Sequence, residues 1–223
     1  MKIIYLFPLL LLFCDAPFVD ANQQFVMIRS SRLSWGIGQM LYIICGSFFY
    51  ALFMLLSSIV VNIGHIQMGA SWGKSLILAG TTNICSILGI QYDTVQISSI
   101  IVKYYTPAQA MLWSFLFLWM ICIILGLIIY DFNILFQSNI VGLFVAGFLI
   151  LFTAVVDGIQ QWIWYSPVSW SSLNNIDVAK TTSLPGIYFV LFVYIGAILA
   201  LLIAGAVLSR SRRFTFEIKN NIQ

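Results

Sequence analysis

Long runs of apolar residues, with little alternation between apolar and polar positions, dominate this chain. Four runs stand out, at residues 40–63, 108–130, 140–156 and 186–208. Each is close to the roughly 20 residues that a helix needs to cross about 30 Å of hydrocarbon, although the third is on the short side. The pattern therefore predicts an all-α, polytopic membrane bundle with four spanning helices.

The composition agrees with a membrane protein and differs from that of a soluble domain. Hydrophobic residues make up 61% of the 223 residues and charged residues only 8%, with a mean hydropathy of +1.01. Soluble domains average roughly 45–50% apolar and about 25% charged residues. We therefore expect a single transmembrane domain over 1–223, with no room for a second, soluble domain.

A shorter apolar stretch at residues 3–13 follows Lys2 and allows two interpretations. It fits a signal peptide with a cleavage site near Ala21, or a short membrane segment. Cleavage would place basic clusters outside the cell at both ends of a four-span chain, which the positive-inside rule disfavours. A membrane segment would instead run inward, preceded by a helix absent from this sequence, or would form a half-inserted hairpin.

The basic residues predict how the chain crosses the membrane. The tail at 209–223 is strongly basic, so we expect a multi-pass plasma-membrane protein with a cytoplasmic C-terminus. Counting back through four spans places Arg29 and Arg32 in the cytoplasm too, and the loops at 64–107 and 157–185 outside. The net charge of +3 comes from clusters that flank apolar runs, so nucleic acid is not an expected partner.

Charged residues are missing from the interiors of the four apolar runs, and Asp131 falls in the link at 131–139, which is predicted to face inward. A charge inside a span costs at least ~2.5–3.5 kcal/mol and usually marks an ion or proton route. The sequence therefore argues against a proton-driven pump or an ion channel.

Residue sets for catalysis or cofactor binding are also sparse. The only histidine is His65 and the only glutamate is Glu217, so an intramembrane enzyme would lack its acid pair, metal ligands or Ser/His pair. The segment at 69–75 resembles a phosphate-binding loop but has Met68 where a glycine is needed. The cysteines form no CxxC pair and are interpreted as small core residues. We expect no enzyme activity, no cofactor and no metal site.

The first outward loop predicts a short helix and the start of the next span. Asp93 and Gln96 form a capping-box pattern, and the apolar residues of 97–104 recur at helical spacing. This pattern is typical of an amphipathic helix on the outer membrane interface. Thr106 followed by a proline and by Gln109 predicts the cap and first turn of a spanning helix.

The second outward loop is rich in aromatic residues. Trp162, Trp164, Tyr165 and Trp170 lie within nine residues of one another. Tyrosine and tryptophan gather where headgroups meet hydrocarbon, because their rings are apolar and their tips are polar. We therefore expect part of this loop to fold back into the outer interface.

The segment at 22–37 joins a polar amphipathic stretch to the first long apolar run. Its apolar residues share roughly one helical stripe with two cations beside it: Phe25, Ile28, Arg29, Arg32 and Trp35. Such a segment can lie at the inner surface, with its cations toward water or lipid phosphate. It is either an anchor that fixes orientation or a docking element for a cytoplasmic partner.

The succession FVMIRSSRLSWGIGQMLYI, from Phe25, contains an amphipathic stretch, a basic turn and the entry to the next span. In these features it resembles the cytoplasmic loop of small bacterial permease subunits of the ABC-2 type. YYTPAQAMLWSFLFLW, WYSPVSWSSL and the tail RSRRFTFEI are similar to later features of the same family. The resemblance covers most of 18–218.

The resemblance implies that the chain is a permease subunit of an ATP-driven exporter. A separate ABC ATPase subunit would dock on the 22–37 segment. A second permease subunit would complete a homo- or heterodimer. The loop at 157–185 would correspond to the family's outward re-entrant helices. Family members have six spans, so four spans and a fragment imply a truncated six-span fold. The alternative is a non-transporting immunity or assembly protein that binds a partner through the outer aromatic loop. Cargo and transport direction stay open.

Overall fold

The structure is a computed structural model that describes residues 2–18, 31–61, 72, 73, 77, 99–178 and 184–211. These parts are helical, apart from turns and one isolated bridge between Asp177 and Gly186. The α-helices are α1 (Lys2–Phe13), α3 (Arg32–Val61), α6 (Ser99–Tyr104), α7 (Pro107–Phe136), α8 (Val141–Val156) and α9 (Ile187–Ser211). Three 3-10 helices follow α8: η2 (Gln160–Tyr165), η3 (Pro167–Ser171) and η4 (Leu173–Asn175).

Three of these helices, α3, α7 and α9, are long and apolar enough to cross a membrane. The all-α prediction is therefore confirmed for the described residues. The expected third span exists as α8 with nearly the predicted bounds, but its 16 residues extend only about 24 Å, which is less than the hydrocarbon thickness. Four spans are thus not confirmed.

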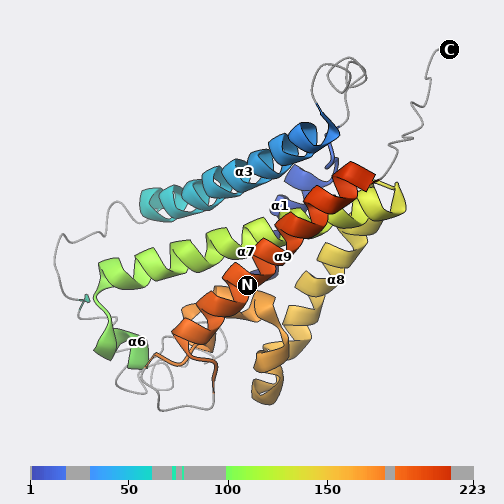
Figure 1. Cartoon of the computed structure of the whole chain (residues 1–223). Coiled ribbons are helices and arrows are strands. Elements are labelled where there is room, and N and C mark those ends of the chain that lie inside the picture. The colour runs from blue at the N-terminus through green and yellow to red at the C-terminus, as the bar shows by residue number, and fades with distance from the viewer. Residues whose placement is uncertain are drawn as a thin grey trace.

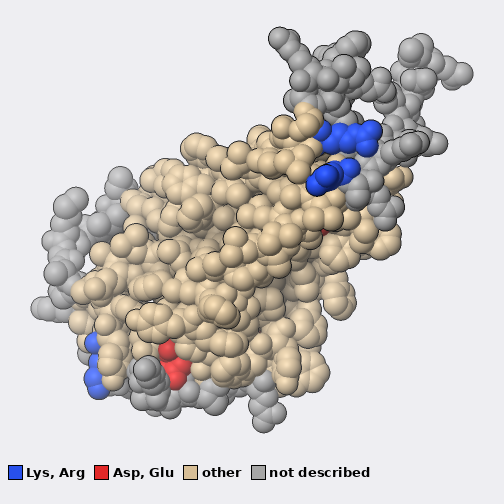
Figure 2. All heavy atoms as spheres, in the orientation of Figure 1, with Lys and Arg blue, Asp and Glu red and all other residues tan. Residues whose placement is uncertain are grey.

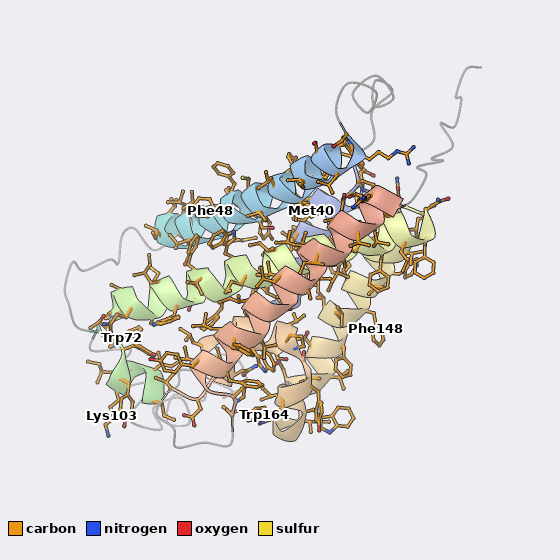
Figure 3. The ribbon with its side chains drawn as sticks, viewed as in Figure 1. Met40, Phe48, Trp72, Lys103, Phe148 and Trp164 are labelled. Carbon is orange, nitrogen blue, oxygen red and sulfur yellow. The ribbon has the colours of Figure 1, made fainter. Side chains whose placement is uncertain are left out.

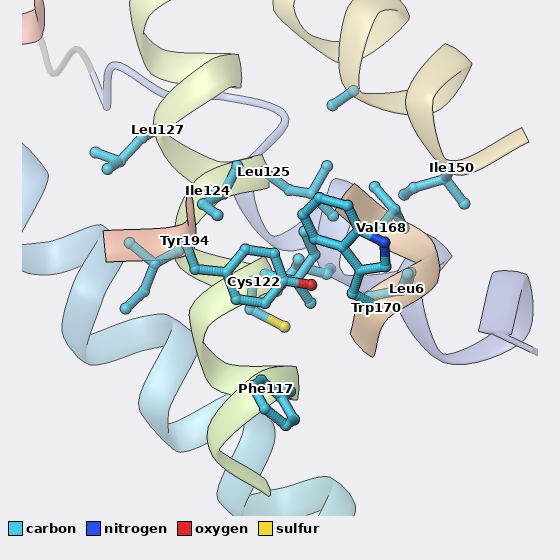
Figure 4. Packing of buried hydrophobic residues seen from close by; sticks show 14 of the residues in the cluster. Leu6, Phe117, Cys122, Ile124, Leu125, Leu127, Ile150, Val168, Trp170 and Tyr194 are labelled. Atoms are coloured by element: carbon cyan, nitrogen blue, oxygen red, sulfur yellow. The ribbon is translucent and has the colours of Figure 1, made fainter. Parts of the chain in front are cut away.

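Helix α7 is the centre of the bundle, with α1, α3, α8 and α9 packed around it (Figure 1). Its second half is buried almost continuously, and Figure 4 shows Cys122, Ile124, Leu125 and Leu127 within this core. Large apolar side chains on the outer faces of the bundle are exposed, among them Phe148 of α8 (Figure 3). In a bilayer these faces suit lipid contact, because lipid tails are as apolar as the side chains.

The short N-terminal helix α1 is part of the core. Leu6, Leu9 and Phe13 are completely buried against the bundle, mainly on the α7 and α8 sides. The Phe13 ring packs against Gly46 of α3 and Gly126 of α7. Because glycine has no side chain, these two positions leave room for the ring. Both interpretations of 3–13, signal peptide and membrane segment, stay predictions.

On the face drawn in Figure 2, the lysine and arginine side chains gather at the two ends of the bundle. The start of α3 and the end of α9 are adjacent, since a side chain at Gly36 would come within 2.6 Å of the Ser209 hydroxyl. Arg32 and Arg210 therefore share one end, while Lys103 of α6 is at the other (Figures 2 and 3). The charge pattern predicts this relative placement; that the shared end faces the cytoplasm stays a prediction.

The start of α7 has the predicted cap. The Thr106 hydroxyl accepts a hydrogen bond from the Gln109 amide, and the Gln109 side chain accepts one from the Thr106 amide. This reciprocal pair satisfies two amides that would otherwise lack partners at a helix start. The short helix predicted upstream is present as α6; the capping pattern at Asp93 and Gln96 lies outside the described residues.

The end of α7 differs from the prediction. The helix does not stop before the 131–139 link but continues to Phe136, and Gln137 ends it in the left-handed conformation with φ 53°. Asp131 is therefore inside a candidate spanning helix and is buried. The apolar run at 108–130 itself contains no charge, as expected, but the prediction that its helix ends before the 131–139 link is wrong.

Candidate functional site

The predicted docking segment is described only at its end. Phe25, Ile28 and Arg29 lie outside the described residues. Arg32 is the first residue of α3 and is exposed, and Trp35, one turn later, is half-buried. The Ser31 hydroxyl accepts a hydrogen bond from the Ser34 amide at 3.2 Å, which is the geometry of an N-cap. Helix α3 therefore begins inside the segment proposed for docking.

Directly after this start, α3 meets α7 and α9 at close range. Gly36 is buried, and a side chain there would come within 2.6 Å of the Ser209 hydroxyl of α9 and 3.3 Å of the Tyr130 hydroxyl of α7. The Ser209 hydroxyl donates to the Ala206 carbonyl of its own helix. Small residues permit such close approach of helices. The place where the three helices meet, defined by Gly36, Tyr130, Asp131, Gly205 and Ser209, is called the junction below.

An acidic side chain lies at the centre of the junction. Asp131 is only 6% exposed, and a side chain at Gly205 of α9 would come within 2.7 Å of its Oδ1 atom and 3.0 Å of the Met40 methyl group. Among the described residues, neither carboxyl oxygen has a hydrogen-bond partner, and the buried hydroxyl of Tyr130 also lacks one. Buried polar groups are almost always paired, so three such atoms together mark this as an unusual site.

The sequence analysis did not find Asp131 because it took the acid as the end of an apolar run. A signal was present in the chain: Phe132, Ile134, Leu135 and Phe136 continue the apolar composition, and the polar turn begins only at Gln137. An acid followed by another turn and a half of apolar helix lies inside that helix. A buried acid in a helix that could cross a membrane is a candidate functional residue.

The aromatic residues of the loop predicted to face outward divide into two groups. Trp162, Trp164 and Tyr165 are 46%, 43% and 79% exposed, as headgroup contacts require. Trp170 departs from this interpretation, because it is buried and its indole nitrogen donates to the Ile163 carbonyl at 2.7 Å. Its ring packs near Tyr194 of α9, as Figure 4 shows. The 3-10 helices thus fold back onto the bundle, with Trp170 as the internal anchor.

A polar cluster holds this fold-back against α1. The Oδ1 atom of Asp157 accepts hydrogen bonds from Lys2, Ser169 and Asn175, each at 3.0 Å. The Lys2 ammonium also donates to the Ser169 carbonyl at 2.9 Å. Burial lowers the pKa of Lys2, and the attraction of Asp157 opposes this shift. The cluster therefore ties the start of α1 to the end of α8 and to η3 and η4.

The cluster predicts unequal effects of removing its two charges. Lys2→Met leaves Asp157 with two donors, so we expect a loss of at most about 1 kcal/mol of unfolding free energy. Asp157→Ala removes the shared acceptor of three donors and leaves a partly buried ammonium with one carbonyl, so we expect a loss of roughly 1–3 kcal/mol. Thermal unfolding of both variants in the same detergent measures the difference. Equal losses would contradict the network.

A crevice opens beside α7 at the end opposite the junction, between α6, the η3–η4 segment and Met54 of α3. Its volume is about 880 Å³, and its lining includes Met54, Met111, Ser114 and Leu118. Trp72 also lines it, and the indole nitrogen of Trp72 donates a hydrogen bond to the Tyr105 carbonyl. The described lining residues carry hydroxyl and amide groups but no charge. A cavity of this size and apolar character suits a small ligand or an acyl chain.

No family model matches the chain, and neither a curated protein nor a solved structure is similar to it.

Proposed function

We propose that this chain is a transmembrane permease subunit of an ATP-driven exporter of apolar, uncharged cargo. The ATP-driven class follows from the sequence resemblance to ABC-2-type permeases, in which a separate ATPase subunit docks on the segment at 22–37. The cargo class follows from the crevice, whose described lining is apolar with neutral polar groups.

One observation carries the proposal: α3 connects the docking segment with the crevice. The helix begins at Arg32, contacts the junction through Gly36 and Met40, and lines the crevice with Met54. A helix is stiff along its axis, so a push at Arg32 moves the whole of α3 relative to α7. Because packed helices shift as units by about 1–2 Å, this movement would widen or narrow the crevice.

The docking assignment is tested by reversing charge at the start of α3. An ATPase subunit is expected to co-purify with the tagged wild-type chain from native membranes. In the double variant Arg29→Glu and Arg32→Glu, we expect most of this ATPase to be lost, because the positive charges that would face the partner become negative. Lys103→Glu, at the opposite end of the bundle, is the matched control and retains the ATPase. Quantitative mass spectrometry measures the bound ATPase. Equal amounts in all three samples would refute the docking site.

A second candidate is a non-transporting assembly or immunity protein that binds a partner through the outer fold-back. The exposure of Trp162, Trp164 and Tyr165 on one 3-10 helix favours it, since exposed aromatic residues are common anchors of protein interfaces. The same co-purification separates the two functions. For this candidate, serine at the three aromatic positions removes the partner, and charge reversal at Arg29 and Arg32 has no effect.

A further inference from the structure

We propose that Asp131 is a proton-binding site, and that loss of its proton loosens the junction of α3, α7 and α9. This inference goes beyond the proposed transport function and does not depend on it. It rests on the geometry of a buried acid that has no partner among the described residues.

The space around Asp131 admits a proton and little else. Both carboxyl oxygens are closed to solvent. The backbone of α9 packs closely on Oδ1, because even a single carbon added at Gly205 would come within 2.7 Å of this atom. A metal ion such as Ca²⁺ needs six or more oxygen ligands, which the methyl group of Met40 and the ring of Tyr130 do not supply. A proton needs no such shell.

Within the described parts of the packed helices, no charged side chain pairs with Asp131. Helix α3 offers Arg32 and helix α9 offers Arg210 at this end, but both side chains are exposed and neither forms an ion pair with Asp131. The titratable group beside it is Tyr130 of its own helix, and the contacts from α3 and α9 come from Gly36, Met40, Gly205 and Ser209.

Ionisation would therefore place an uncompensated charge inside the tight junction. A buried charge without a partner is costly by several kcal/mol, and separation of the helices would relieve that cost by admitting water. The close glycine contacts at Gly36 and Gly205 persist only while the carboxyl is neutral. Proton binding thus favours the closed junction, and proton release favours an open one.

The proton is tested by infrared difference spectroscopy of the full chain in lipid nanodiscs. At neutral pH we expect wild type to show the carbonyl stretch of a protonated carboxyl, shifted in D₂O, and Asp131→Asn to lack it. Asp15→Asn, which changes an exposed acid, is the control and retains the band. A band that is absent from wild type, or that survives in Asp131→Asn, would overturn the proposal.

The movement is tested by pulsed electron resonance between spin labels at Leu33 and Arg210, exposed positions on α3 and α9, in a chain whose cysteines are replaced by serine. We expect the distance to lengthen by about 1–2 Å or more as the infrared band disappears with rising pH. Asp131→Asn keeps the short distance at every pH. The same lengthening in Asp131→Asn, or none in wild type, would refute the coupling. If Asp131→Asn does not fold, the wild type alone decides, because the band and the distance must change together.

Discussion

Replacing Gly142 by alanine is expected to destabilise the bundle strongly, although alanine favours helices. Gly142 lies in the first turn of α8, where the added Cβ atom would overlap the Ile129 carbonyl of α7 and lie 2.8 Å from the Ile129 Cα atom and 2.7 Å from the Asn133 side chain. Backbone atoms cannot rotate away as a side chain does, so α8 must shift from α7. Overpacking of this kind costs typically 1–3 kcal/mol, and contact with backbone places this site at the upper end.

Gly196 supplies the matched control in α9. A Cβ atom there would meet nothing within 4 Å, so Gly196→Ala is expected to be neutral or to stabilise the helix by up to about 1 kcal/mol. The free energy of unfolding of both variants, measured in one detergent by denaturant titration, gives the comparison. The two effects should have opposite signs or differ by at least about 2 kcal/mol. A small, equal change at both sites would show that α8 does not pack on α7 in this way.

The helix cap and the helix bounds that depend on neighbouring residues were predictable from the sequence. The Thr106 cap followed from residue types at fixed spacing, because the reciprocal hydrogen bonds with Gln109 involve only neighbours in the chain. The bounds of α8 followed from the length of its apolar run, and the short length was visible before the structure. Apolar length likewise predicted α9 and the C-terminal end of α3, but α3 begins at Arg32, ahead of the predicted run at 40–63.

The junction was not predictable in the same way. Whether Asp131 faces lipid, water or Gly205 depends on the rotation of α7 and on its crossing with α9, and both are set by packing between segments distant in the chain. Trp170 shows the same limit. It is grouped by sequence with exposed aromatic residues, but the succession of η2 and η3 turns it inward to the Ile163 carbonyl.

The second large effect is expected at Asn133, which joins three segments in the bundle. Its side-chain amide donates to the Ala16 carbonyl after α1 at 2.5 Å, and its oxygen accepts from the Gly142 amide of α8 at 2.8 Å. The residue is completely buried, so water cannot replace it. Asn133→Ala leaves two backbone groups without these partners, at a cost of roughly 1–3 kcal/mol each.

Asn139, exposed in the turn between α7 and α8, is the matched control for Asn133, and Asn139→Ala is expected to change the free energy of unfolding by less than about 0.5 kcal/mol. Because Asn133 holds the chain after α1, its loss also frees that helix. Hydrogen exchange should therefore rise in α1 and at the start of α8 in Asn133→Ala, and stay unchanged in α3. An equal rise in hydrogen exchange across all helices of Asn133→Ala would mean that Asn133 supports global stability without joining these segments.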